Sequence, residues 1–282
     1  MSTALSEFTT ATASDSGQPF VFADAGSGPL VVLFHGFPDT PHGWADTASA
    51  LNGAGYRTVV PYLRGYHPDT IVPGRRYGAR ELGEDAVRLL DALGAEQAIL
   101  VGHDWGAAVV YRAAAAAPER VQAMCAVAIP HPRMLKPSPS LAWGARHFLT
   151  LRLPSGPWLA RRNDFAYIDA LMRRWAPHWS GPERDASLAE VKRAFADPRV
   201  LDGALSYYRH ASSGGAGQLA PPALLVGGTS DIVPAQAFRD SPSGFDGPCE
   251  VMIAEGAGHW PHREAAAEFT PRLLEWLNGL AT

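Results

Sequence analysis

The chain has 282 residues, of which 46% are hydrophobic and 18% charged, with a formal net charge of −4 and a pI near 6.2. This is the composition of a globular protein, and the length allows one large domain with an insertion. The slightly acidic balance provides no overall basic field, which argues against nucleic acid and anionic lipid as partners.

The N-terminal segment is polar and has no basic start followed by an apolar run, so it does not resemble a secretory signal. We expect a flexible tail over residues 1–17. The sequence contains no run of 18 apolar residues, so we expect no membrane span. Two cysteines, Cys125 and Cys249, are too few for a disulfide framework and predict buried free thiols. A cytoplasmic protein without a membrane partner is the expectation.

Short apolar runs alternate with helix-length segments over residues 18–132 and again over 214–282. We predict strands over residues 29–36, 56–61, 97–102, 121–129, 222–228 and 249–255, and helices over 81–94, 106–118 and around 269–277. Strands that are apolar throughout, alternating with helices, indicate a mostly parallel central sheet with helices on both faces. The two segments together are predicted to form the core domain of an α/β protein.

Residues 133–213 interrupt this alternation. The segment has no clear strand, several prolines, helix-like stretches such as 163–177, and four of the eight tryptophans. Ligands of open α/β sheets bind at the carboxyl edge of the strands. We therefore predict a helical cap, or lid, over that edge of the sheet.

The stretch VGHDWGAA, residues 101–108, follows an expected strand and opens an expected helix. Gly102, Gly106 and Ala107 are small where a tight turn would bring the two backbones together. This layout is typical of a nucleophile elbow, in which a strained turn pushes the central side chain into the active site. The central residue here is Asp104.

Two further residues follow expected strands in the order that such an elbow requires. Asp231 comes just after the run that ends at residue 228, and His259 lies in a glycine-rich loop after the last strand. Asp231 could instead cap the helix that begins near Pro234, and His259 could be an ordinary loop residue. Together with Asp104, the three residues in this order predict a catalytic triad.

The loop HGFP, residues 35–38, offers the fourth element of such a site. The backbone N–H groups of Phe37 and Trp105 are predicted to form an oxyanion hole. A cis peptide bond before Pro38 would turn this loop inward. His35 is expected to order the loop rather than take part in chemistry.

Four motifs, HGFPDT (35–40), RGY (64–66), GHDWGAA (102–108) and GAGHWPH (256–262), resemble the α/β-hydrolase superfamily, and within it the epoxide hydrolases. The resemblance extends from about residue 18 onward. That branch shares its aspartate nucleophile with the haloalkane dehalogenases. The resemblance implies the α/β-hydrolase fold and an enzyme that converts a small-molecule epoxide and water to a vicinal diol without cofactor or metal.

An aspartate nucleophile suits attack on a saturated carbon. Serine would leave an unreactive ether on such a carbon, whereas a carboxylate leaves an ester that water can open. We expect Asp104 to form an alkyl-enzyme ester. His259, oriented by Asp231, would then activate the water that hydrolyses it.

The resemblance also assigns roles in the cap. The stretch ALSYYR, residues 204–209, matches the motif that carries a ring-opening tyrosine, here Tyr208, with Tyr207 at an aromatic packing position beside the substrate. Phe37 and Trp105 are implied to contact the substrate as well. A second tyrosine is usual in this branch, but the stretch HFLTLRLP places His147 there. A minority of epoxide hydrolases pairs histidine with tyrosine, although His147 could also be a polar cap residue without this role.

Two other functions stay open. A haloalkane or haloacid dehalogenase would use the same triad, but fluoroacetate dehalogenases bind their substrate with two arginines at the positions of Trp105 and Ala108. A non-catalytic binding protein of the same fold is the remaining alternative. His103 and His131 are expected to be structural, and no grouping has metal-ligand spacing. A homodimer formed through the cap is possible.

Overall fold

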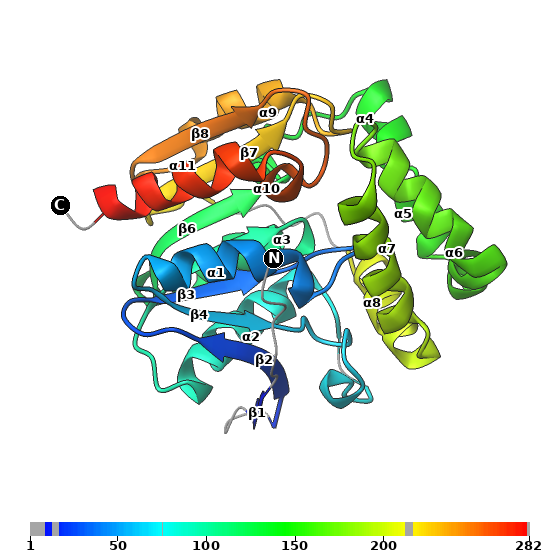
Figure 1. The fold of residues 1–282 in the computed structure, drawn as a ribbon, viewed down its shortest axis with the longest axis horizontal. Coiled ribbons are helices and arrows are strands. Elements are labelled where there is room, and N and C mark those ends of the chain that lie inside the picture. Colours follow the sequence, from blue (N-terminus) through cyan, green and yellow to red (C-terminus); the bar gives the residue numbers. More distant parts are fainter. Residues whose placement is uncertain (1–8, 13–16, 75, 212–216, 281–282) are drawn as a thin grey trace.

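A computed structural model describes residues 9–12, 17–74, 76–211 and 217–280, which form one sheet with helices around it (Figure 1). Its eight strands have the order β1-β2-β4-β3-β5-β6-β7-β8. Their bounds are β1 Thr9–Thr12, β2 Pro19–Ala25, β3 Leu30–Phe34, β4 Arg57–Pro61, β5 Ala98–His103, β6 Val121–Val127, β7 Ala223–Gly228 and β8 Cys249–Ala254.

The helices are α1 Ala45–Gly53, α2 Ala79–Ala92, α3 Trp105–Ala116, α4 Pro139–Gly144, α5 His147–Leu151, α6 Gly156–Trp175, α7 Pro182–Phe195, α8 Pro198–Arg209, α9 Ala235–Asp240, α10 Pro261–Glu264 and α11 Ala266–Gly279. Within α6 the backbone leaves helical geometry from Arg162 to Phe165, so its first turns are separate from the rest. Among the described residues, no helix is long and apolar enough to cross a membrane.

The predicted mostly parallel sheet is confirmed, because β4, β3, β5, β6, β7 and β8 all run parallel to one another. The two strands that the sequence did not reveal, β1 and β2, are antiparallel. Residues 9–12 therefore form an edge strand, where we expected a loose tail over 1–17; the tail residues 1–8 and 13–16 lie outside the described residues. Cys125 is buried, but Cys249 is only half-buried, because it begins the edge strand β8.

Helices cover both faces of the sheet, as expected. On one face, Leu51 of α1, Phe269 of α11 and Trp44, which precedes α1, pack against side chains of the central strands. On the other face, α2 and α3 pack Leu89 and Val110 into a larger core. The sheet is therefore buried on both sides, which explains why its central strands are apolar along their whole length.

The helices α4 to α8 all lie between β6 and β7 in the chain and stand together at one end of the sheet (Figure 1). The backbones of Gly203 in α8 and Gly65 after β4 approach so closely that a Cβ on Gly203 would lie 2.5 Å from the Gly65 carbonyl oxygen. Gly65 also has φ +81°, a left-handed conformation that favours glycine. This close approach seats α8 over the carboxyl ends of the strands.

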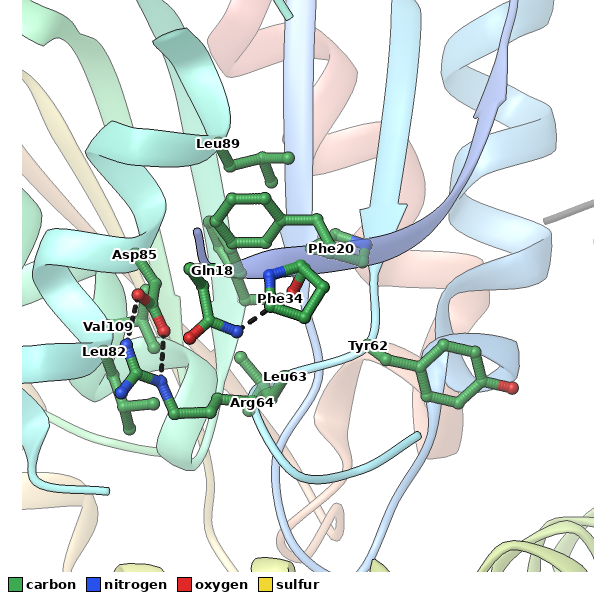
Figure 2. A pocket seen from close by; sticks show the side chains of 12 residues that line it. Gln18, Phe20, Phe34, Tyr62, Leu63, Arg64, Leu82, Asp85, Leu89 and Val109 are labelled. Carbon is green, nitrogen blue, oxygen red and sulfur yellow. Dashed lines mark hydrogen bonds and ion pairs between the residues drawn. The ribbon is translucent and has the colours of Figure 1, made fainter. Parts of the chain in front are cut away.

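Next in the chain to Gly65, the buried Arg64 lines a small pocket between β2 and α2 (Figure 2). Its guanidinium group donates two hydrogen bonds to the carboxylate of Asp85, at 2.7 Å and 2.5 Å. The Arg64 carbonyl oxygen accepts a hydrogen bond of 2.7 Å from the hydroxyl of Tyr207 in α8. Arg64, from the RGY motif, therefore connects the sheet to the helices above it.

We expect Asp85→Ala to destabilise the protein by about 3–5 kcal/mol, because the substitution leaves the Arg64 charge buried without a partner. Chemical denaturation of the variant and the wild type measures this change. The matched control is Glu84→Ala, which removes a half-exposed partner of Arg80 and should cost less than about 1 kcal/mol. Equal losses for the two variants would contradict the role assigned to Arg64.

Candidate active site

Asp104 stands at the sharp turn between β5 and α3. Its φ of 52° and ψ of −114° lie in a region that residues other than glycine rarely adopt. The surrounding backbone leaves no room for larger neighbours: a Cβ on Gly102 would lie 2.1 Å from the Gly106 carbonyl oxygen, and one on Gly106 would lie 2.1 Å from that of Phe34. The predicted strained turn between strand and helix is confirmed, and close packing on both sides holds it in place.

The side chains of Asp104, His259 and Asp231 lie together, although they come from three separate loops. The Nδ1 atom of His259 is 2.9 Å from Asp231 Oδ2, and its Nε2 atom is 3.4 Å from Asp104 Oδ2. Carboxylate oxygens only accept hydrogen bonds, so both ring nitrogens of His259 face acceptors. This arrangement favours the doubly protonated, positively charged imidazole.

The pKa values of the two central groups follow from the same contacts. Burial by itself would lower the pKa of His259, but the negative charges and hydrogen bonds of Asp231 and Asp104 outweigh it and raise the pKa to about 10. Burial by itself would raise the pKa of Asp104, but the hydrogen bond and charge of His259 bring it below its usual value. At neutral pH the site therefore holds an ionised Asp104 beside a cationic His259.

A backbone N–H group is bonded to the Asp104 carboxylate. The N–H of Phe37 donates a hydrogen bond of 2.8 Å to Asp104 Oδ1, and the Phe37–Pro38 peptide bond is cis, as predicted. Trp105 is the first residue of α3, so its N–H has no acceptor within the helix. Gly36 must be glycine, because a Cβ there would lie 2.5 Å from the Cβ of Asp104.

Tyr208 of α8 is buried above this group. Its ring lies 5.2 Å from that of Phe37 and 5.5 Å from that of Trp105. Burial, and then the negative charge of Asp104, raise the pKa of Tyr208 well above its usual value. The hydroxyl is therefore a proton donor throughout the neutral range.

His147 begins α5, with its ring 5.5 Å from that of Tyr208. Its Nδ1 atom is 3.3 Å from the Gly144 carbonyl oxygen, and a carbonyl oxygen can only accept. Burial lowers the pKa of His147 to about 4, so the ring is neutral at pH 7. In the tautomer that satisfies Gly144, the Nε2 atom carries no hydrogen. This atom is then an acceptor rather than a donor.

Tyr207, the neighbour of Tyr208, points toward the sheet rather than the triad. Its hydroxyl is committed to the Arg64 carbonyl oxygen, and its ring lies 5.4 Å from that of Trp105 and 5.5 Å from that of Tyr66. The side chain is fully buried. It supports Trp105 from below, in keeping with an aromatic packing position.

Two other histidines hold the loops of the site. His35 accepts a hydrogen bond at Nε2 from the backbone N–H of Leu63, and its Nδ1 lies 3.0 Å from the Gly36 carbonyl oxygen. The expectation that His35 orders its loop is confirmed. The Nε2 atom of His103 donates to the His259 carbonyl oxygen over 2.8 Å. His103 therefore fixes the loop that presents His259.

Behind His259, the buried side chains of Asp39, His103 and His262 offer ligand atoms that lie within 4.8 Å of one another. The sequence did not indicate this grouping, because its members are far apart in the chain. Ligand atoms around a tetrahedral zinc ion lie about 3.3 Å apart, given zinc–ligand bonds of about 2.0–2.1 Å. The Nδ1 atom of His103 and the Oδ2 atom of Asp39 are 3.9 Å apart, which is longer than this separation.

Comparisons with known proteins agree with this geometry. The family model described as the alpha/beta hydrolase fold matches residues 29–266. The chain is 31% identical to Epoxide hydrolase A of Mycobacterium tuberculosis, over 89% of this chain and 91% of that protein. It is 30% identical to the AB hydrolase superfamily protein YfhM of Bacillus subtilis, over 89% and 90% of the two chains.

The solved structures agree as well. The crystal structure of epoxide hydrolase VrEH1 from Vigna radiata superimposes with a TM-score of 0.80 at 26% identity, over 98% of this chain and 100% of that one. The matches thus extend over the sheet and the helices above it. The chain belongs to the α/β-hydrolase family, on the branch that contains the epoxide hydrolases.

Proposed function

We propose that this protein hydrolyses epoxides to vicinal diols, with Asp104 as the nucleophile, and that it needs no cofactor. The observation that carries this proposal is the position of an ionised aspartate at a strained elbow, between a cationic histidine and a buried tyrosine hydroxyl. Aspartate in this place suits attack on a saturated carbon. Relatives named as epoxide hydrolases supply the substrate class.

The first step forms an ester. An oxygen of the Asp104 carboxylate attacks one epoxide carbon, and the bond from this carbon to the epoxide oxygen breaks. Tyr208 gives its proton to the departing oxygen, which becomes the first hydroxyl group of the product. Phe37 and Trp105 line the space between nucleophile and acid, where their rings face the substrate.

Ester formation itself prepares His259 for the second step. The ester is neutral, so the charge and hydrogen bond of Asp104 that raise the pKa of His259 disappear. His259 then releases a proton, which restores the hydroxyl of Tyr208. The neutral imidazole that remains, oriented by Asp231 through the 2.9 Å contact at Nδ1, is ready to act as a base.

The second step opens the ester. His259 takes a proton from water while the water oxygen attacks the carbonyl carbon of Asp104. The backbone N–H groups of Phe37 and Trp105 stabilise the oxyanion that forms there. Collapse of this intermediate releases the diol, leaves the water oxygen in the Asp104 carboxylate, and restores the cationic His259.

Within this scheme we propose unequal roles for the two cap residues. Tyr208 keeps its hydroxyl proton at neutral pH because its pKa is raised, whereas His147 can donate to the epoxide oxygen only from Nε2. That tautomer would give up the bond from Nδ1 to the Gly144 carbonyl oxygen. Tyr208 is thus the principal acid, and His147 is its secondary partner. Tyr207 acts on the substrate indirectly, by holding Trp105.

We further propose that the enzyme works in the cytoplasm, since its two free cysteines, Cys125 and Cys249, suit a reducing compartment. A homodimer formed through the cap stays a prediction.

Turnover of styrene oxide and of 1-bromobutane tests the proposed function. We expect diol from the first and no bromide from the second, and we expect Asp104→Ala to abolish diol formation because no ester can form. The matched control is Asp46→Ala, an exposed aspartate of α1, which should retain full activity. Bromide release without diol would instead assign the protein to the dehalogenases.

Replacement of His259 by glutamine should separate the two steps. The ester should form but persist, so intact-protein mass should rise by the full mass of styrene oxide, because the opened oxygen stays on the carbon skeleton. His178→Gln, at an exposed position of the cap, serves as the control and should show no adduct. An adduct that has lost a leaving group, or no adduct with an epoxide that the wild type consumes, would contradict the mechanism.

Tyr208→Phe should lower kcat by about 10²-fold, because one positioned general acid contributes about that factor. His147→Phe should cost less than about tenfold, since the neutral ring has no hydrogen on Nε2 in the tautomer bonded to Gly144. Steady-state kinetics with styrene oxide give both values. A larger loss for His147→Phe than for Tyr208→Phe would make histidine the principal acid.

A further inference from the structure

The strongly exposed large hydrophobic side chains of the described residues all lie in one short stretch of the cap. They are, with their exposed fractions, Trp143 (70%), Phe148 (36%), Leu149 (68%), Leu153 (51%) and Trp158 (61%). We call these five residues the cap patch. Isolated exposed hydrophobic residues are common on protein surfaces, whereas a concentration of this kind marks an interaction surface.

The cap patch occupies α4, α5, the turn with Leu153 and the first turns of α6. These helices form the outer edge of the cap, on the side away from α7 and α8 (Figure 1). The backbone break from Arg162 to Phe165 separates the first turns of α6 from the rest of this helix. The cap patch is therefore presented by short helical pieces at the periphery of the molecule.

The charge of this region is opposite to that of the whole chain. No aspartate or glutamate occurs between Glu119 and Asp164, although the protein has a net charge of −4. Apart from Arg120, which precedes β6, the basic residues of this interval are Arg133, Lys136, Arg146, Arg152, Arg161 and Arg162. Two of these arginines lie over patch tryptophans: Arg146 is 4.2 Å from the ring centre of Trp143, and Arg162 is 5.1 Å from that of Trp158.

Tryptophan, leucine and phenylalanine interleaved with arginine form the surface composition of segments that lie in a membrane interface. The rings and aliphatic side chains enter the boundary of the acyl chains, and the guanidinium groups pair with anionic head groups. A second copy of this chain fits less well, because contact between two cap patches would bring like-charged arginines together. The charge thus favours a negatively charged, apolar partner.

Phe148 connects the cap patch to the candidate active site. Its ring is 4.9 Å from that of Tyr208, 4.8 Å from that of His147 and 6.2 Å from that of Trp105, yet more than a third of the side chain is exposed. Among the described residues, the two tryptophans of the patch show no such ring contacts with the site. Phe148 is therefore the side chain that faces both the surface and the active site.

We propose that the cap patch docks this enzyme on an anionic lipid surface, and that apolar epoxides dissolved in the lipid reach Tyr208 past Phe148. The second half of this statement rests on the proposed function, but the first does not. The overall net charge suggested no attraction to anionic lipid. The local distribution of charge reverses that expectation. The basic residues around the cap patch have no aspartate or glutamate beside them in the interval between Glu119 and Asp164.

Vesicle flotation tests the docking without any assay of activity. We expect the protein to float with vesicles of equal parts phosphatidylglycerol and phosphatidylcholine at low salt, and to bind pure phosphatidylcholine vesicles at least about tenfold more weakly. Binding should weaken as salt rises to about 0.5 M, because the charges are then screened. Equal binding to both vesicles, or none to either, would overturn the proposal.

Two sets of variants identify the surface. Trp143→Ser with Trp158→Ser, and separately Arg152→Gln with Arg161→Gln, should each reduce flotation at least about tenfold. The control is Arg80→Gln with Arg193→Gln, two exposed arginines outside the cap patch. Unchanged flotation of the tryptophan variant would overturn the assignment. So would a concentration-dependent dimer of the wild type that this variant abolishes, because the occupant would then be a second copy.

A kinetic comparison tests the path of the substrate. The tryptophan variant should hydrolyse styrene oxide in water at the wild-type rate, which also shows that it is folded. It should hydrolyse a long-chain epoxide held in phosphatidylglycerol vesicles several-fold more slowly than the wild type. Equal rates on the vesicle substrate, despite lost flotation, would overturn the path past Phe148. Absence of any diol from the wild type would instead contradict the proposed function and leave the docking result standing.

Discussion

The close approach of three backbone segments around Asp104 is the constraint on which the site depends. The turn after β5 holds a residue with a side chain at φ 52°, and it can do so only because Gly36, Gly102 and Gly106 leave space for it. Strain of this kind persists where the surroundings over-determine the backbone. The surroundings of Asp104 are two strands, a helix and the loop that carries Phe37. The strain keeps the carboxylate at the edge of the sheet, within reach of groups from other loops.

The charges around His259 then determine what this geometry can do chemically. One imidazole lies between two carboxylates in a buried space, so its pKa follows the charge of Asp104. A group that is cationic beside a free carboxylate and neutral beside an ester can serve both halves of the reaction we propose. His103 contributes by holding the His259 backbone in place, which links the nucleophile turn directly to the loop of its partner.

The cap completes the site and also faces outward. Tyr208 and Tyr207 are adjacent in α8 but make different contacts, because successive residues of a helix point in different directions. The ring of Tyr208 lies against those of Phe37 and Trp105, and the hydroxyl of Tyr207 is bonded to the backbone of the buried Arg64. On the far side of the same cap, tryptophans and leucines remain exposed among arginines. Burial of one helical face and exposure of another suit an enzyme that meets its substrate at a surface.

Local patterns were sufficient to predict much of this protein. Apolar runs ending at glycine or a polar loop predicted six parallel strands, since a strand buried on both faces must be apolar throughout. The motif around Asp104 predicted its own turn, because small residues at fixed spacing are a local requirement of that backbone. The strands β1 and β2 escaped notice, because β1 has only four, mostly polar residues and β2 pairs with β4, which is distant in the chain.

Contacts between residues that are far apart in the chain could be seen only in the tertiary structure. The sequence placed His147 near the epoxide oxygen by resemblance, but only the packed cap shows its Nδ1 facing the Gly144 carbonyl oxygen. The grouping of Asp39, His103 and His262, and the position of Phe148 between surface and site, likewise depend on loops that meet after folding. Sequence by itself identified the residues that we propose carry the chemistry and where each lies along the chain. The tertiary structure decided their hydrogen-bond partners, pKa values and exposure, because these depend on neighbours brought close in space.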